Sequence, residues 1–133
     1  MIIVMHGHHN ILLSVVESME SRLLEIDTDK PEEERPLRRR LIQEVPQDRL
    51  PSEILRTALS WRETQIVWRE AWQKAEIGLR EAEIPWREAD IAWWKAIRAW
   101  GIALTYHRTE LEALHAELCV PDCPWDGETI FPE

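Results

Sequence analysis

The sequence predicts an all-α fold, with short N-terminal amphipathic helices, one long helix that carries a Trp/Ala heptad pattern, and an extended C-terminal arm. Three observations support this prediction. The chain of 133 residues is 44% apolar, which is enough to bury a core, and it contains only 4 glycines. Alternating runs of Val, Ile and Thr, which half-buried strands require, are nearly missing. Finally, tryptophan and alanine recur every seven residues in the second half of the chain.

We divide the chain into three segments on this basis. Residues 1–51 should hold the N-terminal helices and their proline-bounded connectors. Residues 52–119 should form the heptad-patterned helix, and residues 120–133 the extended arm, which is rich in proline.

Two short helices are expected in the first segment. The first is Asn10 to Ile26, because its apolar residues fall on one broad helical face. The second is Leu37 to Glu44, which ends before Pro46. The apolar face of the first predicted helix comprises Ile11, Leu12, Val15, Val16, Met19 and Leu23.

The long helix should begin after Pro51, where Ser52 is a suitable N-cap. Pro85 is the one serious interruption, since a proline inside a helix costs about 3 kcal/mol unless the helix kinks or restarts. The alternatives are one kinked helix or a helical hairpin that turns at Pro85. We predict the kinked helix, because an Ile-Pro step without Gly, Asn or Ser beside it makes a poor hairpin loop.

The heptad pattern predicts a coiled-coil-like seam. One column of large residues is followed, three positions later each time, by alanine, and a spacing of three then four is the a/d pattern of a coiled coil. We expect the indoles to anchor a partner helix and the alanines to permit its close approach. The alternative is an ordinary core stripe of a helical bundle. The seam comprises Trp61, Trp68, Trp72, Ala75, Leu79, Ala82, Trp86, Ala89, Trp93, Ala96, Trp100 and Ala103.

Isoleucines form a second apolar stripe, about 140° around the helix from the tryptophan column. The helix should therefore be covered on more than one side, by another copy of the chain or by a different protein. Folding back within a monomer is the alternative. In the arm, Trp125 and Phe131 are candidate anchors, either in a groove of a neighbouring subunit or on the chain's own helix. The stripe comprises Ile66, Ile77, Ile84 and Ile91.

A candidate zinc site lies near the end of the long helix. His115 and Cys119 are one helical turn apart, and a turn at Pro121 could bring Cys123 back towards them. Imidazole and thiolate are usual zinc ligands, but the fourth ligand is not obvious, although His107 lies nearby. A disulfide between the two cysteines and two ordinary thiols are the alternatives, so our leading expectation is no cofactor. His6, His8 and His9 could also bind a metal, but a flexible terminus accounts for them better.

Several functional classes are disfavoured. A formal charge of −9 argues against a general nucleic-acid binder. We find no recognisable nucleophile motif and no glycine-rich phosphate loop, so we expect no enzyme. No secretory signal and no apolar run of about 18 residues is present, so no transmembrane segment is expected. Membrane-surface binding is also disfavoured, because the polar side of the tryptophan helix is not lysine-rich.

Our leading prediction is a non-enzymatic structural protein that oligomerises, or packs into a larger assembly of protein subunits. In composition and outline the chain resembles the small helical proteins with extended arms found in virions of tailed bacteriophages, which would imply a virion component. Otherwise we expect a cytoplasmic protein. The alternatives are a small adaptor that binds one cellular or host protein, and a zinc-stabilised interaction module.

Overall fold

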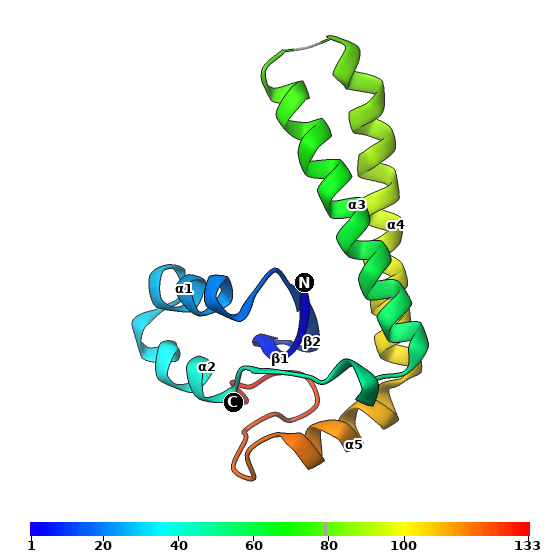
Figure 1. The fold of residues 1–133 in the computed structure, drawn as a ribbon. Helices are drawn as coiled ribbons and strands as arrows, with labels where there is room; N and C mark the ends of the chain where they lie inside the picture. Colours follow the sequence, from blue (N-terminus) through cyan, green and yellow to red (C-terminus); the bar gives the residue numbers. More distant parts are fainter. Residues whose placement is uncertain (79) are drawn as a thin grey trace. The chain divides into compact units, whose positions relative to one another are not determined.

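The computed structural model describes residues 1–78 and 80–133, apart from the side chain of Ala82. The all-α prediction is wrong, because the described chain is 66% helical but also contains a three-stranded antiparallel sheet near the N-terminus (Figure 1). The chain forms two compact units. We call Met1–Leu50 with His107–Glu133 the α/β unit, and Pro51–Tyr106 the helical hairpin.

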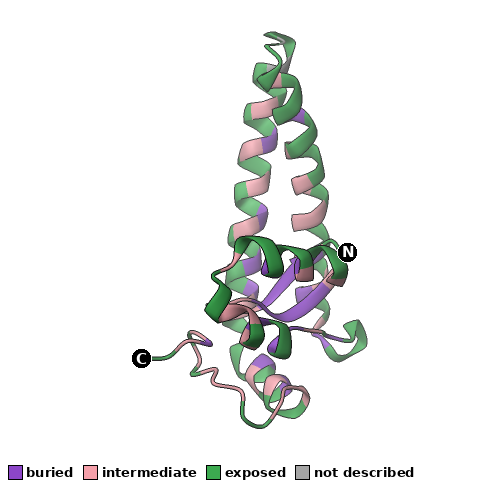
Figure 2. Cartoon of the chain, turned by 90° about the vertical axis from the view of Figure 1, so that its left-hand side faces the viewer, coloured by how far each residue is buried: buried purple, intermediate pink, exposed green. Residues whose placement is uncertain are grey.

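The sheet replaces the first half of the predicted helix Asn10–Ile26. Strand β1 (Ile2–His8) is central, and it pairs with β2 (Ile11–Val16) on one side and with β3 (Gln43–Glu44) on the other. Several successive residues of β1 are buried, so the strand is covered on both faces and lacks the alternation that reveals a half-buried strand (Figure 2). A short, continuously apolar run fits a strand as well as a helix, which is why the prediction failed here.

Helix α1 (Met19–Asp29) begins only after Ser18, whose side-chain oxygen accepts a hydrogen bond from the backbone nitrogen of Ser21 at 3.1 Å. It packs with β1 and the end of α2 around Val4, Ile26 and Ile42. The other elements of the α/β unit are η1 (Glu32–Glu34), α2 (Arg35–Leu41), η2 (Gln47–Arg49) and α5 (Arg108–Leu118).

The single kinked helix is also a wrong prediction. Helix α3 (Ser52–Glu76) and helix α4 (Glu83–Tyr106) are separate and pack together as a hairpin (Figure 1). Gly78 begins the reversal with a φ of 82°, a left-handed conformation that glycine adopts at little cost. Pro85 then lies in the first turn of α4, where backbone N–H groups have no acceptor within the helix, so it breaks no hydrogen bond.

The Trp/Ala pattern lies largely between the two helices of this hairpin. The ring of Trp68 in α3 stacks on that of Trp93 in α4, with centroids 4.6 Å apart. The indole nitrogen of Trp68 also donates to Asp90 at 2.9 Å. Leu79 and the side chain of Ala82 lie outside the described residues. The buried members of the predicted seam are Ala89, Ala96, Trp100 and Ala103; Trp61, Trp68, Ala75, Trp86 and Trp93 are intermediate, and Trp72 is exposed.

The buried alanines of the hairpin predict a sharp sensitivity to side-chain size. Ala96 is 5% exposed, so Ala96→Leu should overpack the α3–α4 contact and lower the free energy of unfolding by about 1–3 kcal/mol. Ala99→Leu is the matched control, because Ala99 is an exposed position on the same helix and should change stability by only about 0.5 kcal/mol. Urea unfolding followed by tryptophan fluorescence measures both. Equal losses would contradict this packing.

Candidate metal centre

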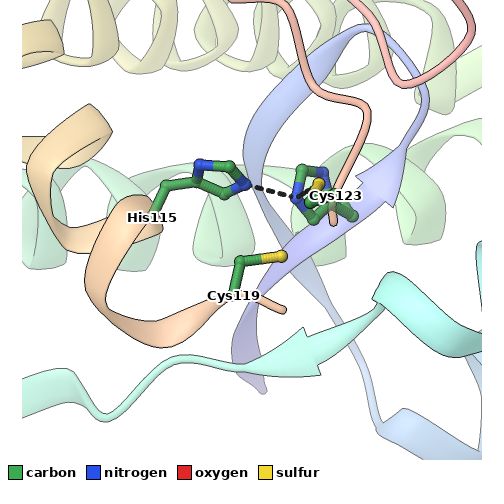
Figure 3. A group of neighbouring side chains, drawn as sticks. His115, Cys119 and Cys123 are labelled. Atoms are coloured by element: carbon green, nitrogen blue, oxygen red, sulfur yellow. Dashed lines mark hydrogen bonds between the residues drawn. The ribbon is translucent and has the colours of Figure 1, made fainter. Parts of the chain in front are cut away.

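Four side chains of the α/β unit converge on one point. His6 comes from β1, His115 from α5, Cys119 from the residue after α5, and Cys123 from the tail that follows. One potential ligand atom from each lies within 4.8 Å of all the others. Figure 3 shows His115, Cys119 and Cys123 gathered where the end of α5 and the tail meet the strands.

A β-bulge directs His6 into this cluster. Met5 pairs with Leu13 and His8 with Ile11, so two residues of β1 lie opposite one residue of β2. His6 has a φ of 56°, which makes it the only non-glycine residue with a left-handed backbone in the described chain. Its side chain is 1% exposed. A left-handed backbone at a residue other than glycine costs about 1–3 kcal/mol and is often found at functional sites. Its occurrence at a buried histidine makes His6 a candidate functional residue.

Gly7 and Arg22 hold the bulge in place. A Cβ atom on Gly7 would lie 2.4 Å from Ser14 Oγ and 2.8 Å from a methyl carbon of Val4, so only glycine fits there. The buried guanidinium of Arg22 in α1 donates to the carbonyl oxygen of Gly7 and pairs with Glu25. The bulge is therefore tied to the helix that packs on the sheet.

The end of α5 and a tight turn supply the other three residues. His115 and Cys119 lie one helical turn apart, and the backbone nitrogen of Cys119 donates to the carbonyl oxygen of His115 at 2.9 Å. The chain then turns, and the backbone nitrogen of Cys123 donates to the carbonyl oxygen of Val120 at 3.1 Å. Asp122 within this turn pairs with Arg40 at 2.7 Å.

The cluster is compact, and burial favours the neutral form of both of its imidazoles. Nε2 of His6 lies 3.0 Å from Nε2 of His115 and 3.5 Å from Sγ of Cys123. Burial, followed by the nearby His115, lowers the pKa of His6 to about 4, and burial also lowers the pKa of His115. Burial and the neighbouring Cys123 raise the pKa of the Cys119 thiol to about 11. Neutral imidazole is the form of histidine that binds metals.

Trp125 covers the cluster. Its ring centroid lies 5.7 Å from that of His6 and 6.4 Å from that of His115. Its indole nitrogen donates to both carboxylate oxygens of Glu112, at 3.1 and 3.2 Å, which fixes the ring across α5. An apolar ring in this position limits solvent access to the site.

The rest of the C-terminal arm packs within the α/β unit. The backbone nitrogen of Ile130 donates to the carbonyl oxygen of His9 at 2.9 Å, and its side chain is buried. The guanidinium of Arg38 lies 5.3 Å from the ring centroid of Phe131. The described part of the arm thus makes contacts with its own chain.

These four residues could hold a metal ion such as zinc. Zinc binds sulfur at about 2.3 Å and nitrogen at about 2.0–2.1 Å, so a tetrahedral site separates its ligand atoms by roughly 3.3–3.8 Å. The contacts of His6 with His115 and with Cys123 lie close to these separations. Four protein ligands leave no position for substrate, which is typical of a structural rather than a catalytic site.

The structure brings together the three residues predicted as candidate ligands and adds His6 as a candidate fourth. His107 is not part of the cluster, since its Nδ1 lies 3.2 Å from Glu110 instead. Both cysteines are free thiols. The expectation of a flexible N-terminus is wrong, because His6 is buried in β1, although His9 is exposed. One sequence signal could have placed His6 on a strand. A short polar segment separates the apolar runs of β1 and β2, and this arrangement is typical of a β-hairpin.

Comparisons with other proteins add no assignment: no family model, no curated protein and no solved structure matches the chain.

The tight approach at the bulge predicts that any side chain at position 7 destabilises the two strands. Gly7→Ala should lower the free energy needed to open β1 and β2 by about 1–3 kcal/mol, because the new methyl group would overlap Ser14 and Val4. Hydrogen exchange of the β1 and β2 amides measures this opening. Gly101→Ala is the control, since nothing lies within 4 Å of the Cβ it would gain in α4. Unchanged exchange in Gly7→Ala would contradict the tight approach at the bulge.

Trp125 should protect the thiols. Trp125→Ala should speed alkylation of Cys119 and Cys123 by iodoacetamide several-fold in the presence of a chelator, because removal of the covering ring opens the cluster to the reagent. Mass spectrometry of the modified peptides gives the rates. Trp94→Ala removes an exposed indole from the hairpin and serves as the control. If the two variants react alike, Trp125 does not shield the cluster.

Proposed function

We propose that this chain is a non-enzymatic protein-interaction module, in which a structural zinc ion stabilises the α/β unit and the helical hairpin provides the binding surface. The proposal rests on one observation above all: His6, His115, Cys119 and Cys123 converge with donor atoms suited to zinc. Two imidazoles and two thiols form a common ligand set of structural zinc sites.

The position of these ligands along the chain supports a stabilising role. The α/β unit contains 77 residues, 50 from Met1–Leu50 and 27 from His107–Glu133, and domains of this size bury little apolar surface per residue. His6 and His115 are 109 positions apart in the sequence. A metal ion bound by both would connect the N-terminal strand to the C-terminal segment. Because such a cross-link closes a long loop, it strongly reduces the conformational freedom of the unfolded chain.

The hairpin has the properties of a binding surface. It carries 8 of the 16 basic residues and 8 of the 25 acidic ones, so it is neutral, and the α/β unit carries the whole formal charge of −9. A neutral surface with large exposed apolar side chains indicates protein association. No helix in the described part of the chain has the length and apolar character needed to cross a membrane. The exposed apolar side chains of the hairpin include Leu59, Ile66, Val67, Trp72, Ile77, Ile84, Ile91, Trp94 and Ile102.

The zinc proposal predicts one zinc ion per chain after purification without chelators. Stripping the metal should lower the melting temperature of the protein strongly, and adding zinc should restore it, because binding of a structural zinc ion contributes directly to folding. Elemental analysis and thermal unfolding measure the two quantities. His115→Ala and Cys119→Ser should abolish stoichiometric zinc.

His9→Ala is the matched control, because it removes an exposed imidazole outside the cluster. It should retain one zinc ion per chain. Metal-free protein that unfolds at the same temperature with and without zinc would refute a structural metal.

A further inference from the structure

We infer that Cys119 and Cys123 are a redox modification site, at which a peroxide converts two zinc-binding thiolates into a disulfide, releases the metal and loosens strand β1. This inference rests on the zinc site proposed above and describes how that site is regulated. It follows from the distribution of the four candidate ligands along the chain, since both sulfur ligands belong to one short segment and His6 comes from the other end of the sequence.

The two thiols are close enough to be joined. Their sulfur atoms belong to a cluster in which all potential ligand atoms lie within 4.8 Å of one another (Figure 3). A disulfide bond is about 2.05 Å long, so its formation brings the sulfurs together by less than about 3 Å. The chain contains only 2 cysteines, so a disulfide within one chain has a single possible pairing.

The backbone around the two cysteines is held by local hydrogen bonds. The backbone nitrogen of Cys119 donates to the carbonyl oxygen of His115 at 2.9 Å, and that of Cys123 donates to the carbonyl oxygen of Val120 at 3.1 Å. Neither hydrogen bond involves strand β1. The turn that places the two thiols together therefore does not depend on His6, and it can remain when the site loses its metal.

Both sulfur atoms are accessible to a small oxidant. Cys119 and Cys123 are each partly exposed, whereas His6 is 1% exposed. The thiolate is the form of cysteine that reacts with peroxides, and zinc holds its cysteine ligands in this form. The loaded site thus presents two thiolates side by side, which is the arrangement that disulfide formation requires.

The oxidation balances with a peroxide as the only oxidant. One thiolate attacks an oxygen of hydrogen peroxide and the O–O bond breaks, which gives a sulfenic acid and a hydroxide ion. The second thiolate then attacks the sulfenic sulfur, so the S–S bond forms, the S–O bond breaks and a second hydroxide ion leaves. Each hydroxide takes a proton from solvent to become water. The two sulfurs together lose two electrons, and the peroxide oxygens gain them.

The disulfide and the bound metal exclude each other. Thiolates bind metals, and a disulfide has no thiolate to offer. Oxidation therefore removes two of the four candidate ligands in one event. The two imidazoles of His6 and His115 remain, which is fewer than the three or four protein ligands of ordinary zinc sites.

Oxidation also replaces a long-range connection by a local one. A metal bound by His6 and His115 connects residues that are 109 positions apart. A disulfide between Cys119 and Cys123 closes a loop of only 5 residues, which constrains the unfolded chain much less. His6 then loses a bond that helps to offset the strain of its left-handed backbone. Strand β1 should therefore open more readily in the oxidised protein.

The test is a titration of the full-length, zinc-loaded protein with hydrogen peroxide. Wild-type protein should release one zinc ion for each disulfide formed, and a chromogenic chelator measures this release. The mass of the intact chain should fall by two hydrogen atoms, and peptide mapping should show Cys119 joined to Cys123. Treatment with a thiol reductant and zinc should restore both the free thiols and the bound metal.

Hydrogen exchange tests the structural consequence. Exchange of the β1 amides should rise several-fold on oxidation, to the level of reduced protein treated with a chelator, because both forms lack the metal. Amides of α3 are the internal control, because this helix belongs to the hairpin and not to the unit that contains the cluster. Their exchange should stay the same.

Two variants separate disulfide formation from general oxidation. Cys123→Ser leaves Cys119 without an intramolecular partner, so peroxide should add oxygen to Cys119 and should not remove two hydrogens from the chain. His9→Ala is the matched control, because it removes an exposed imidazole outside the cluster and should respond to peroxide as the wild type does.

Several outcomes would overturn the inference and leave the proposed zinc site standing. These are thiols that stay reduced in peroxide, zinc that is retained after the disulfide forms, and zinc that leaves only as the cysteines gain oxygen. Unchanged β1 exchange after release of the metal would also overturn it. Protein that neither carries zinc nor binds added zinc would instead refute the proposed metal site, and the inference with it.

Discussion

The α/β unit depends on the conformation of one buried residue, His6. Its left-handed backbone makes the bulge in β1, and the bulge turns an imidazole out of the strand register towards α5 and the tail. The strain of that backbone must be offset by its surroundings. Gly7 allows the close approach of β2, and Arg22 ties the bulge to α1. Gly7 and Arg22 thus both serve the position of one side chain.

The helical hairpin obeys a different constraint, which is the close approach of two helices. Small alanines in the seam let α4 lie near α3, and stacked indoles such as Trp68 and Trp93 fill the space beside them. A hydrogen bond from Trp68 to Asp90 satisfies a polar group that packing would otherwise leave without a partner. Part of the seam is thus buried within the chain, whereas the isoleucines on the backs of the helices stay exposed.

Periodic features could be predicted from the sequence, and features that depend on distant residues could not. The seven-residue repeat indicated both the helical segment and its seam, because a helix repeats its own geometry locally. The same repeat could not show that the partner helix belongs to the same chain, because Gly78 and Pro85 allow either a kink or a reversal. The strands were missed because coverage of β1 on both faces removes the alternation that distinguishes a strand from a helix.

The candidate site likewise contains residues that could be predicted from the sequence and one that could not. His115, Cys119 and Cys123 were predicted because helical spacing and one turn place them together. His6 could not be predicted, since it lies more than a hundred positions away and reaches the cluster only through the sheet and its bulge. The local hairpin signal can place His6 on a strand, but it cannot show that this strand meets the end of α5, and here that residue completes the set of four.

The two units therefore use their polar and apolar groups in opposite ways. The α/β unit turns its metal-binding groups inward, covers them with Trp125, and carries the acidic charge of the chain on its surface. The hairpin keeps its surface neutral and leaves isoleucines exposed on both backs. Net acidic charge keeps a protein soluble, whereas exposed apolar faces promote association.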